Sequence, residues 1–234
     1  MEKAYKNISL FFLIILTIVV LGFFKTYFGL FPAFKEVTNI QHIHGLLFLL
    51  WFVMLIIQPI LIKRKLYKWH RLLGKVSYFL VPLIVLSIFF IAKEMFETMP
   101  ADMPQTNRIS ILYVPFYQIL DFVLLYVLAI HYKKKIAYHM RYMIATSLAV
   151  YGAALKRAFI NFGGVNGKEA FLYTFILTDL IIIGLIIYDL KHRKDYKPYL
   201  VSLIILMLSQ IGFYFLRDTD FWQKLCGGFV HLFY

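Results

Sequence analysis

The sequence contains a single cysteine, Cys226, among its 234 residues. One cysteine excludes an internal disulfide and any cysteine cluster that would hold zinc or an iron–sulfur centre. Charged residues are also scarce, at 16% of the chain, whereas hydrophobic residues make up 62%. Soluble domains contain roughly 25% charged and roughly 45–50% apolar residues. The composition therefore excludes an ordinary soluble domain.

Common motifs of catalysis and nucleotide binding are absent as well. The chain has no P-loop, no GxSxG nucleophile elbow and no HExxH zinc motif. The last apolar stretch has no lysine, so a retinal of the rhodopsin type has no attachment point there, and we expect no retinal. The sequence predicts no catalytic residue and does not decide whether the protein is an enzyme.

Long apolar runs are what the chain does have. A membrane-spanning helix needs about 20 apolar residues. Seven stretches have about that length: Ile8–Phe28, Ile40–Ile62, His70–Ala92, Ile109–Ile130, Met140–Phe162, Ala170–Leu190 and Tyr199–Leu216. We predict an all-α, polytopic membrane protein, with a seven-helix membrane domain over residues 1–217 and an interfacial C-terminal tail over residues 218–234.

Basic residues are distributed unevenly between alternate loops. The N-terminus, Lys63–Lys75, Lys133–Arg141 and Lys191–Lys197 together hold 16 of the 25 lysines and arginines. Because basic loops stay in the cytoplasm, we predict a cytoplasmic N-terminus and an outside C-terminus in a bacterial cytoplasmic membrane. The net charge of +13 is then a topology signal. The expected partner is the lipid bilayer, and no nucleic-acid partner is expected.

Polar side chains within the second span lie on one helical face. His44, Trp51 and Gln58 are separated by seven residues each, and seven steps of about 100° return almost to the starting direction. His42 points about 160° away from His44 on a regular helix, so the two could share a metal ion only where the backbone is irregular. His44 either bonds a neighbouring helix or belongs to a functional site.

Three further charged residues lie within apolar spans, where exposure to lipid would cost several kcal/mol. They are Asp121, Arg157 and Asp179. We predict that Arg157 pairs with Asp179, as a structural or a functional ion pair. The predicted intramembrane polar site comprises His44, Trp51, Gln58, Asp121, Arg157 and Asp179.

A second polar layer lies at the predicted cytoplasmic ends of the spans. It consists of His70, Arg71, His131, His139, Arg141 and Asp189. One interpretation is an interfacial belt in which basic groups meet lipid phosphates. The other is a cofactor site, in which His70 and His139 or His131 bind haem b or a transition metal while Arg71 and Arg141 pair with haem propionates.

The order of several motifs resembles a family of bacterial multi-pass membrane proteins of unknown function. The matching segments are GFFKTYF, HIHGLLFLLWFVMLIIQPILI, HRLLGKVSY, YHMRYMIA, KRAF and TDLIIIGLIIYDL, between Gly22 and about Pro198. The resemblance implies a multi-helix fold and important positions at His42, His44, Trp51, Gln58, His70, Arg71, His139, Arg141, Arg157, Asp179 and Asp189. It implies no activity. The HRLLG segment is also similar to part of the di-haem cytochrome b proteins.

Three functions therefore stay open from the sequence. The first is a membrane redox protein that holds haem b or a metal at the cytoplasmic histidines, with His44 near an outer quinone or metal pocket. The second is a transporter of a small solute or protons along His44, Gln58, Asp121 and Asp179. The third is a receptor or assembly factor whose polar core only fixes helix packing. The redox hypothesis leads, because histidine is the commonest metal ligand and an axial haem ligand.

Overall fold

The computed structural model describes residues 5–234. Within this range the chain is helical and has no strand, which confirms the predicted all-α class. The elements, in chain order, are α1 (Ile8–Gly22), η2 (Phe28–Leu30), α2 (Asn39–Lys63), α3 (Tyr67–Glu97), α4 (Gln105–Ile111), α5 (Tyr113–His131), α6 (Ile136–Val150), α7 (Gly152–Gly163), α8 (Gly167–Lys191), α9 (Lys197–Phe215) and α10 (Asp220–Phe233).

Five helical segments are long and apolar enough to cross a membrane, namely α2, α3, Gln105–His131, α8 and α9. The pair α6 and α7 makes a sixth if it counts as one span, bent by 43°. Helix α1 has 15 residues and is about 22 Å long at about 1.5 Å per residue, short of a hydrocarbon core of about 30 Å. The structure therefore supports a multi-pass protein with five or six crossing segments, and the seventh span stays a prediction.

Local sequence sets where two of the long helices begin. Thr38 Oγ1 accepts a hydrogen bond from the Gln41 N–H, and the Gln41 side chain accepts one from the Thr38 N–H, at the start of α2. Asn166 and Glu169 form the same reciprocal pair at the start of α8. Each pair satisfies amide groups that a helix leaves without intrahelical partners.

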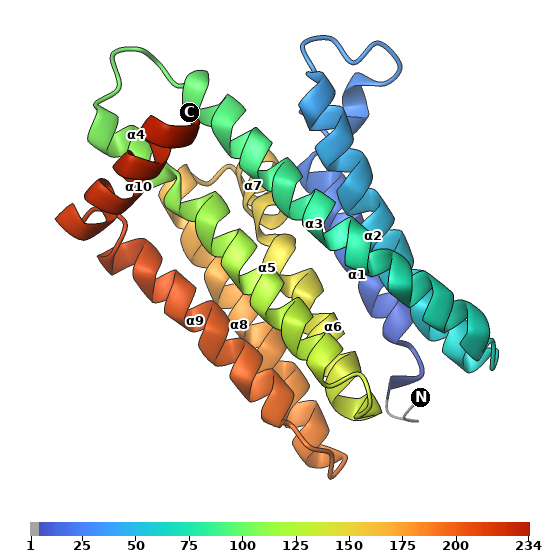
Figure 1. The fold of residues 1–234 in the computed structure, drawn as a ribbon. Helices are drawn as coiled ribbons and strands as arrows, with labels where there is room; N and C mark the ends of the chain where they lie inside the picture. The colour runs from blue at the N-terminus through green and yellow to red at the C-terminus, as the bar shows by residue number, and fades with distance from the viewer. Residues whose placement is uncertain (1–4) are drawn as a thin grey trace.

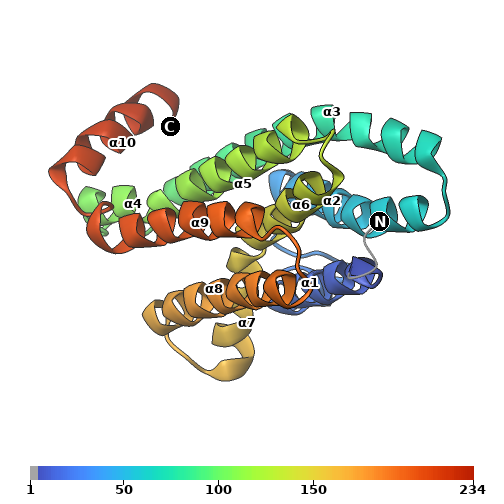
Figure 2. The same cartoon turned by 90° about the horizontal axis from the view of Figure 1, so that it is seen from below.

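The helices form two groups that meet along one side (Figures 1 and 2). One group holds α1, α2 and α3, and the other holds α5, α6, α7, α8 and α9. Helix α1 packs against both α2 and α7 and so joins the groups. The short connections 64–66, 132–135 and 192–196 lie at one end of the bundle, near the described start of the chain (Figure 1).

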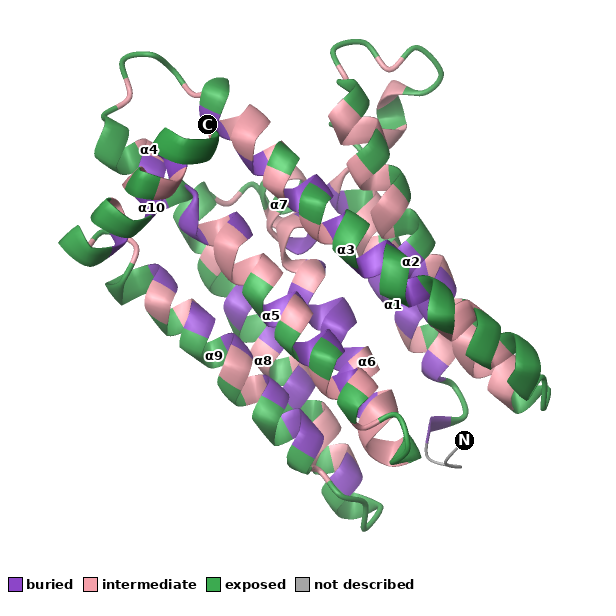
Figure 3. Ribbon diagram, in the orientation of Figure 1, coloured by how far each residue is buried: buried purple, intermediate pink, exposed green. Residues whose placement is uncertain are grey.

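Large apolar side chains cover the outside of the bundle, where Figure 3 shows exposed residues along the outer helices. Phe79 on α3 is 75% exposed, Leu208 on α9 is 63% exposed and Phe215 is 77% exposed. Water-soluble monomers rarely expose apolar surface over so many helices. A lipid environment accounts for this pattern, because lipid tails solvate apolar side chains without a hydrophobic penalty.

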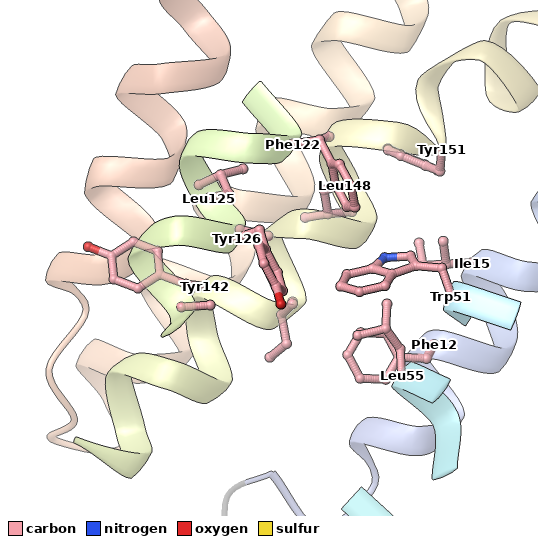
Figure 4. Close-up of a cluster of buried hydrophobic side chains, with 14 of the residues drawn as sticks. Phe12, Ile15, Trp51, Leu55, Phe122, Leu125, Tyr126, Tyr142, Leu148 and Tyr151 are labelled. Atoms are coloured by element: carbon pink, nitrogen blue, oxygen red, sulfur yellow. The ribbon is translucent and has the colours of Figure 1, made fainter. Parts of the chain in front are cut away.

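The core lies where the two helix groups meet (Figure 4). Trp51 of α2 is fully buried, with its ring centre 5.1 Å from that of Phe122 and 5.9 Å from that of Tyr126, both on α5. Phe12 and Ile15 of α1 belong to the same cluster. Burial of one aromatic side chain of this kind stabilises the fold by about 1.5–3 kcal/mol.

The C-terminal helix α10 folds back onto the bundle end opposite the short connections (Figure 2). The Trp222 indole N–H donates to the Ile109 carbonyl at 3.2 Å, and the Tyr234 hydroxyl donates to the Phe89 carbonyl at 3.2 Å. Phe221 and Leu232 on the same helix are 64% and 75% exposed. The packing and the exposed apolar face suit an interfacial helix, and the position of this tail in a membrane stays a prediction.

Candidate functional site

A cavity of about 730 Å³ opens between the two helix groups. Its walls come from α1, α2, α3, α5 and α6 and from the 132–135 connection, and most of the lining side chains are apolar. Ligand pockets in proteins measure roughly 300–1,000 Å³ and combine apolar walls with a few polar groups. The polar residues among those that line this cavity are Gln58, Tyr67, His70, Arg71, Lys75, Ser77, Tyr78, Lys133 and His139.

His139, near the start of α6, has a defined tautomer in this wall. Its Nδ1 lies 2.8 Å from the carbonyl oxygen of Ala129 on α5. A carbonyl oxygen only accepts, so Nδ1 carries the proton and Nε2 of the neutral ring keeps its lone pair. Histidines that bind metals are oriented by a hydrogen bond of this kind through the other ring nitrogen.

His70, near the start of α3, lines the same cavity. Its Nδ1 is buried and has no hydrogen-bond partner in the described part of the chain. Gln58 donates from Nε2 to the His70 carbonyl at 3.2 Å, which leaves Gln58 Oε1 buried and also without a partner. Unsatisfied buried polar atoms are rare and call for an explanation. Both atoms belong to residues that line the cavity, although neither atom is itself accessible from it.

Arg71, Lys75 and Lys133 supply positive charge at this cavity. All three line it, and all three are exposed. Arg71 and Lys75 lie in the first turns of α3, which follow the 64–66 connection, and Lys133 lies in the 132–135 connection. An anionic group on an otherwise apolar ligand would find charge complementarity here.

Two of the predicted cofactor residues do not line the cavity. His131 is exposed, and its ring packs edge-on against Tyr132 at 4.8 Å. Arg141 is fully buried and forms a bidentate ion pair with Asp189 of α8, with nitrogen–oxygen distances of 2.6 and 2.8 Å. The prediction that Arg141 pairs with a haem propionate is therefore wrong, because its guanidinium is already neutralised inside the protein.

The Arg141–Asp189 pair also holds the start of the chain. The Tyr5 hydroxyl donates to Asp189 Oδ1 at 2.6 Å, and the Arg141 guanidinium lies 5.0 Å from the Tyr5 ring centre and 5.9 Å from that of Tyr199. Burial, followed by the hydrogen bond to Asp189, raises the pKa of Tyr5 above its usual value. The hydroxyl therefore stays protonated and can donate to the carboxylate.

The predicted pair of Arg157 and Asp179 does not form. Asp179 Oδ1 accepts a hydrogen bond from Gln210 of α9 at 2.9 Å. The Arg157 guanidinium lies over the ring of Phe23, 4.8 Å from its centre. Helical periodicity gave the direction of each side chain on its own helix, and the 43° bend between α6 and α7 changes the direction after Tyr151. The buried arginine that does pair with a carboxylate is Arg141, and its partner is Asp189.

The two outer histidines have separate partners. His42 Nδ1 lies 2.8 Å from the Tyr27 hydroxyl, and its ring contacts Phe34 at 5.0 Å. His44 Nδ1 lies 3.1 Å from Ser87 Oγ on α3. No group of three or more His, Cys, Asp or Glu side chains suited to a metal ion occurs within residues 5–234. The predicted His42 and His44 metal site gains no support from these contacts and stays a prediction.

The predicted intramembrane polar site is divided between separate places. Gln58 lines the large cavity, Trp51 belongs to the apolar core, and Asp121 lines a second, much smaller hollow. His44 lines neither of these two cavities. Neither of these two cavities connects His44, Gln58 and Asp121, and the transport path stays a prediction.

Several polar residues at these sites have no counterpart among the predicted ones. They are Gln118, Ser209, Gln210, Tyr5 and Tyr199. Gln118 precedes Asp121 by three residues, and residues at this spacing are neighbours on one face of a helix. The spacing could therefore have identified Gln118. Ser209 and Gln210 are adjacent polar residues inside an apolar span. Such a pair indicates a polar site, and it could have identified both residues from the sequence.

Comparison with protein-family models, with curated proteins and with solved structures finds no match for this chain.

Proposed function

We propose that the protein is a membrane redox protein that binds haem b, or alternatively a transition metal, in the cavity between His70 and His139. The observation that carries the proposal is that one cavity of about 730 Å³ takes in both histidines. Each comes from the start of a different helix, α3 or α6. Bis-histidine ligation requires two imidazoles from separate elements at one cavity.

The residues at the cavity fit such a cofactor in three respects. His139 has an unprotonated Nε2, because its Nδ1 donates to Ala129. His70 has a buried ring nitrogen without a partner in the described chain. The apolar walls suit a macrocycle, whereas Arg71 and Lys133 suit its propionates. Bound haem would supply one-electron transfer, and the protein residues would hold and orient it.

The redox partner class that the chemistry favours is a quinone or another small apolar molecule that moves within the bilayer. Such a partner would reach the cavity from the lipid, because the outer helices expose apolar side chains. No separate quinone pocket is assigned, since His44, the predicted outer candidate, is held by Ser87.

We further propose seven membrane spans, a cytoplasmic N-terminus and an outside C-terminus in the bacterial cytoplasmic membrane. The charge distribution supports this orientation. The connections 64–66, 132–135 and 192–196 gather at one end of the bundle, and the segments around them are the basic ones in the sequence. The positive-inside rule assigns that end to the cytoplasm. The short helix α1 would provide the seventh span together with the residues that follow it.

The test is the absorption spectrum of the protein purified in detergent after expression with ample iron and haem precursor. A Soret band that shifts on reduction, with a haem content near one per chain, is expected. His70→Ala and His139→Ala should each lower the haem content severalfold. His131→Ala is the matched control, because His131 lies at the same end of the bundle but does not line the cavity. It should keep the wild-type spectrum.

Two results would contradict the proposal. One is a colourless protein in which elemental analysis also finds no stoichiometric transition metal. The other is a haem content that His131→Ala lowers and that His70→Ala and His139→Ala leave unchanged. Size-exclusion profiles of all variants check that the fold is intact.

A further inference from the structure

A second, water-sized hollow of about 30 Å³ lies between α5, α6, α8 and α9. Its polar lining comes from Tyr117, Gln118 and Asp121 of α5, from Thr174 and Thr178 of α8 and from Gln210 of α9. A cavity needs roughly 10–15 Å³ of such free volume to hold one water molecule. The hollow therefore accommodates one water molecule or one small ion, and none of its residues lines the large cavity.

Asp121 is the charged group of this hollow. It is 1% exposed, and its Oδ1 accepts a hydrogen bond from Ser209 Oγ at 2.7 Å. The second carboxylate oxygen has no hydrogen bond to the rest of the described protein, and no lysine, arginine or histidine lines the hollow. A buried carboxylate without a compensating charge is costly in a membrane and marks an ion or proton site.

Three of the neighbouring polar side chains present oxygen lone pairs, because each uses a proton elsewhere. Thr174 Oγ1 donates to the Ala170 carbonyl and Thr178 Oγ1 to the Thr174 carbonyl, both at 2.7 Å. The Tyr151 hydroxyl, 3.0 Å from Thr178 Oγ1, takes one of the two Thr178 lone pairs. Gln210 Nε2 donates to Asp179 at 2.9 Å, which leaves its Oε1 as an acceptor. Gln118, three residues before Asp121, has no hydrogen bond from its side chain within the described chain. With the Asp121 carboxylate, these oxygen atoms can coordinate a small cation.

A helix break lies against the same hollow. Helix α6 ends at Val150 and α7 begins at Gly152, with a bend of 43° between them. Ala149 and Gly152, on the two sides of the break, both line the hollow. Interrupted membrane helices commonly supply backbone carbonyls to Na⁺ sites, in addition to side-chain oxygens.

From this combination we infer that the hollow is a binding site for a small monovalent cation, Na⁺, held by the Asp121 carboxylate together with the side-chain oxygens of Gln118, Gln210 and Thr178. One carboxylate balances one positive charge. A divalent ion would lack a second carboxylate, since Asp179 does not line the hollow. The oxygen-only donor set suits a hard cation. This site is independent of the proposed haem site and shares no residue with it.

Ligand-dependent stability of the full-length protein in detergent tests the inference. An ion that binds only the folded state raises the melting midpoint in a saturable way. In mildly alkaline buffer at constant ionic strength, replacing choline by Na⁺ should raise the midpoint of the wild-type protein, and replacing choline by K⁺ should raise it much less. Asp121→Asn should abolish the Na⁺ response, and Gln210→Leu should shift it to higher Na⁺ concentration.

Ser202→Ala is the control, because Ser202 is a buried polar residue of α9, the helix of Gln210, that donates to the Pro198 carbonyl and does not line the hollow. It should keep the wild-type Na⁺ response. A wild-type protein that melts equally in Na⁺ and choline would overturn the inference, and this result does not depend on any variant folding. So would a Na⁺ response that survives in Asp121→Asn.

Discussion

Arg141 and Asp189 show how one residue pair can hold distant parts of this chain together. Both side chains are fully buried, and their bidentate contact joins α6 to α8. The hydroxyl of Tyr5, a residue that precedes α1, donates a hydrogen bond to the Asp189 carboxylate, and the Tyr199 ring of α9 lies beside the Arg141 guanidinium. Such a pair contributes little net stability over apolar residues of similar volume, but loss of one partner leaves an uncompensated buried charge.

We predict that Arg141→Met or Asp189→Leu alone lowers the free energy of unfolding by about 3–5 kcal/mol, and that the double variant is less destabilised than the sum of the two. Denaturant unfolding in mixed micelles measures the three values. Arg157→Met and Asp179→Leu form the control pair, because they do not contact each other. Their effects should add within about 0.3–0.5 kcal/mol. Additive effects at Arg141 and Asp189 would show that the ion pair is not coupled.

At the scale of elements, the contact between α1 and α7 depends on one glycine. A Cβ at Gly22 would collide with the backbone of Ala154. Around this contact the Asn161 side chain donates to the Gly22 carbonyl at 3.2 Å, and Lys25 donates to the Asn161 carbonyl at 2.8 Å. Small residues allow helix backbones in membranes to approach closely, and α1 joins the two helix groups by this approach.

Gly22→Ala should therefore destabilise the protein by about 1–3 kcal/mol, the usual cost of overpacking. Gly184→Ala is the control, because a Cβ at Gly184, also within a helix, has no neighbouring atom within 4 Å. It should be neutral or stabilising by up to about 1 kcal/mol, the helix propensity difference. Melting midpoints of the two variants in detergent decide the question. Equal melting midpoints for the two variants would contradict the prediction, because they would show that α1 and α7 can move apart without a loss of stability.

At the scale of the whole molecule, charge and apolar surface together define how the protein sits in a membrane. The outer helix faces expose large apolar side chains, and the basic connections share one end of the bundle (Figure 1). The large cavity lies toward this basic end, since Lys133 and Lys75 line it, whereas α10 lies at the other end. In the proposed orientation, the cavity would therefore lie in the cytoplasmic half of the membrane.

We predict that a reporter fused after Tyr234 is active only outside the cytoplasm, because the orientation has a cytoplasmic N-terminus and an odd number of spans. A fusion within the 132–135 connection is the internal control and should report the cytoplasm. Paired enzymatic reporters that work on opposite sides of the membrane make the measurement. A cytoplasmic C-terminus would contradict both the seven-span count and the orientation.

The sequence by itself determined the class of this protein and the extent of most of its helices. Long apolar runs predicted α2, α8 and α9 closely, for example Ile40–Ile62 against the observed Asn39–Lys63. The predicted stretch Ile8–Phe28 is helical only to Gly22, and Met140–Phe162 is divided between α6 and α7. Helix ends follow from local groups such as Thr38 with Gln41. The placement of His70 and His139 at one level also followed from the sequence, because both begin helices on the same side. Each of these features depends on local interactions along one segment.

Only the tertiary structure decided which polar groups meet. Helical periodicity fixes the direction of a side chain around its own axis but not the neighbouring helix that it faces. Arg157 was therefore assigned to Asp179 in error, whereas Arg141 took Asp189 and Asp179 took Gln210. The cavity that unites His70 and His139, and the hollow beside Asp121, are likewise spaces between helices. Their shape depends on packing between segments far apart in sequence, which no local pattern records.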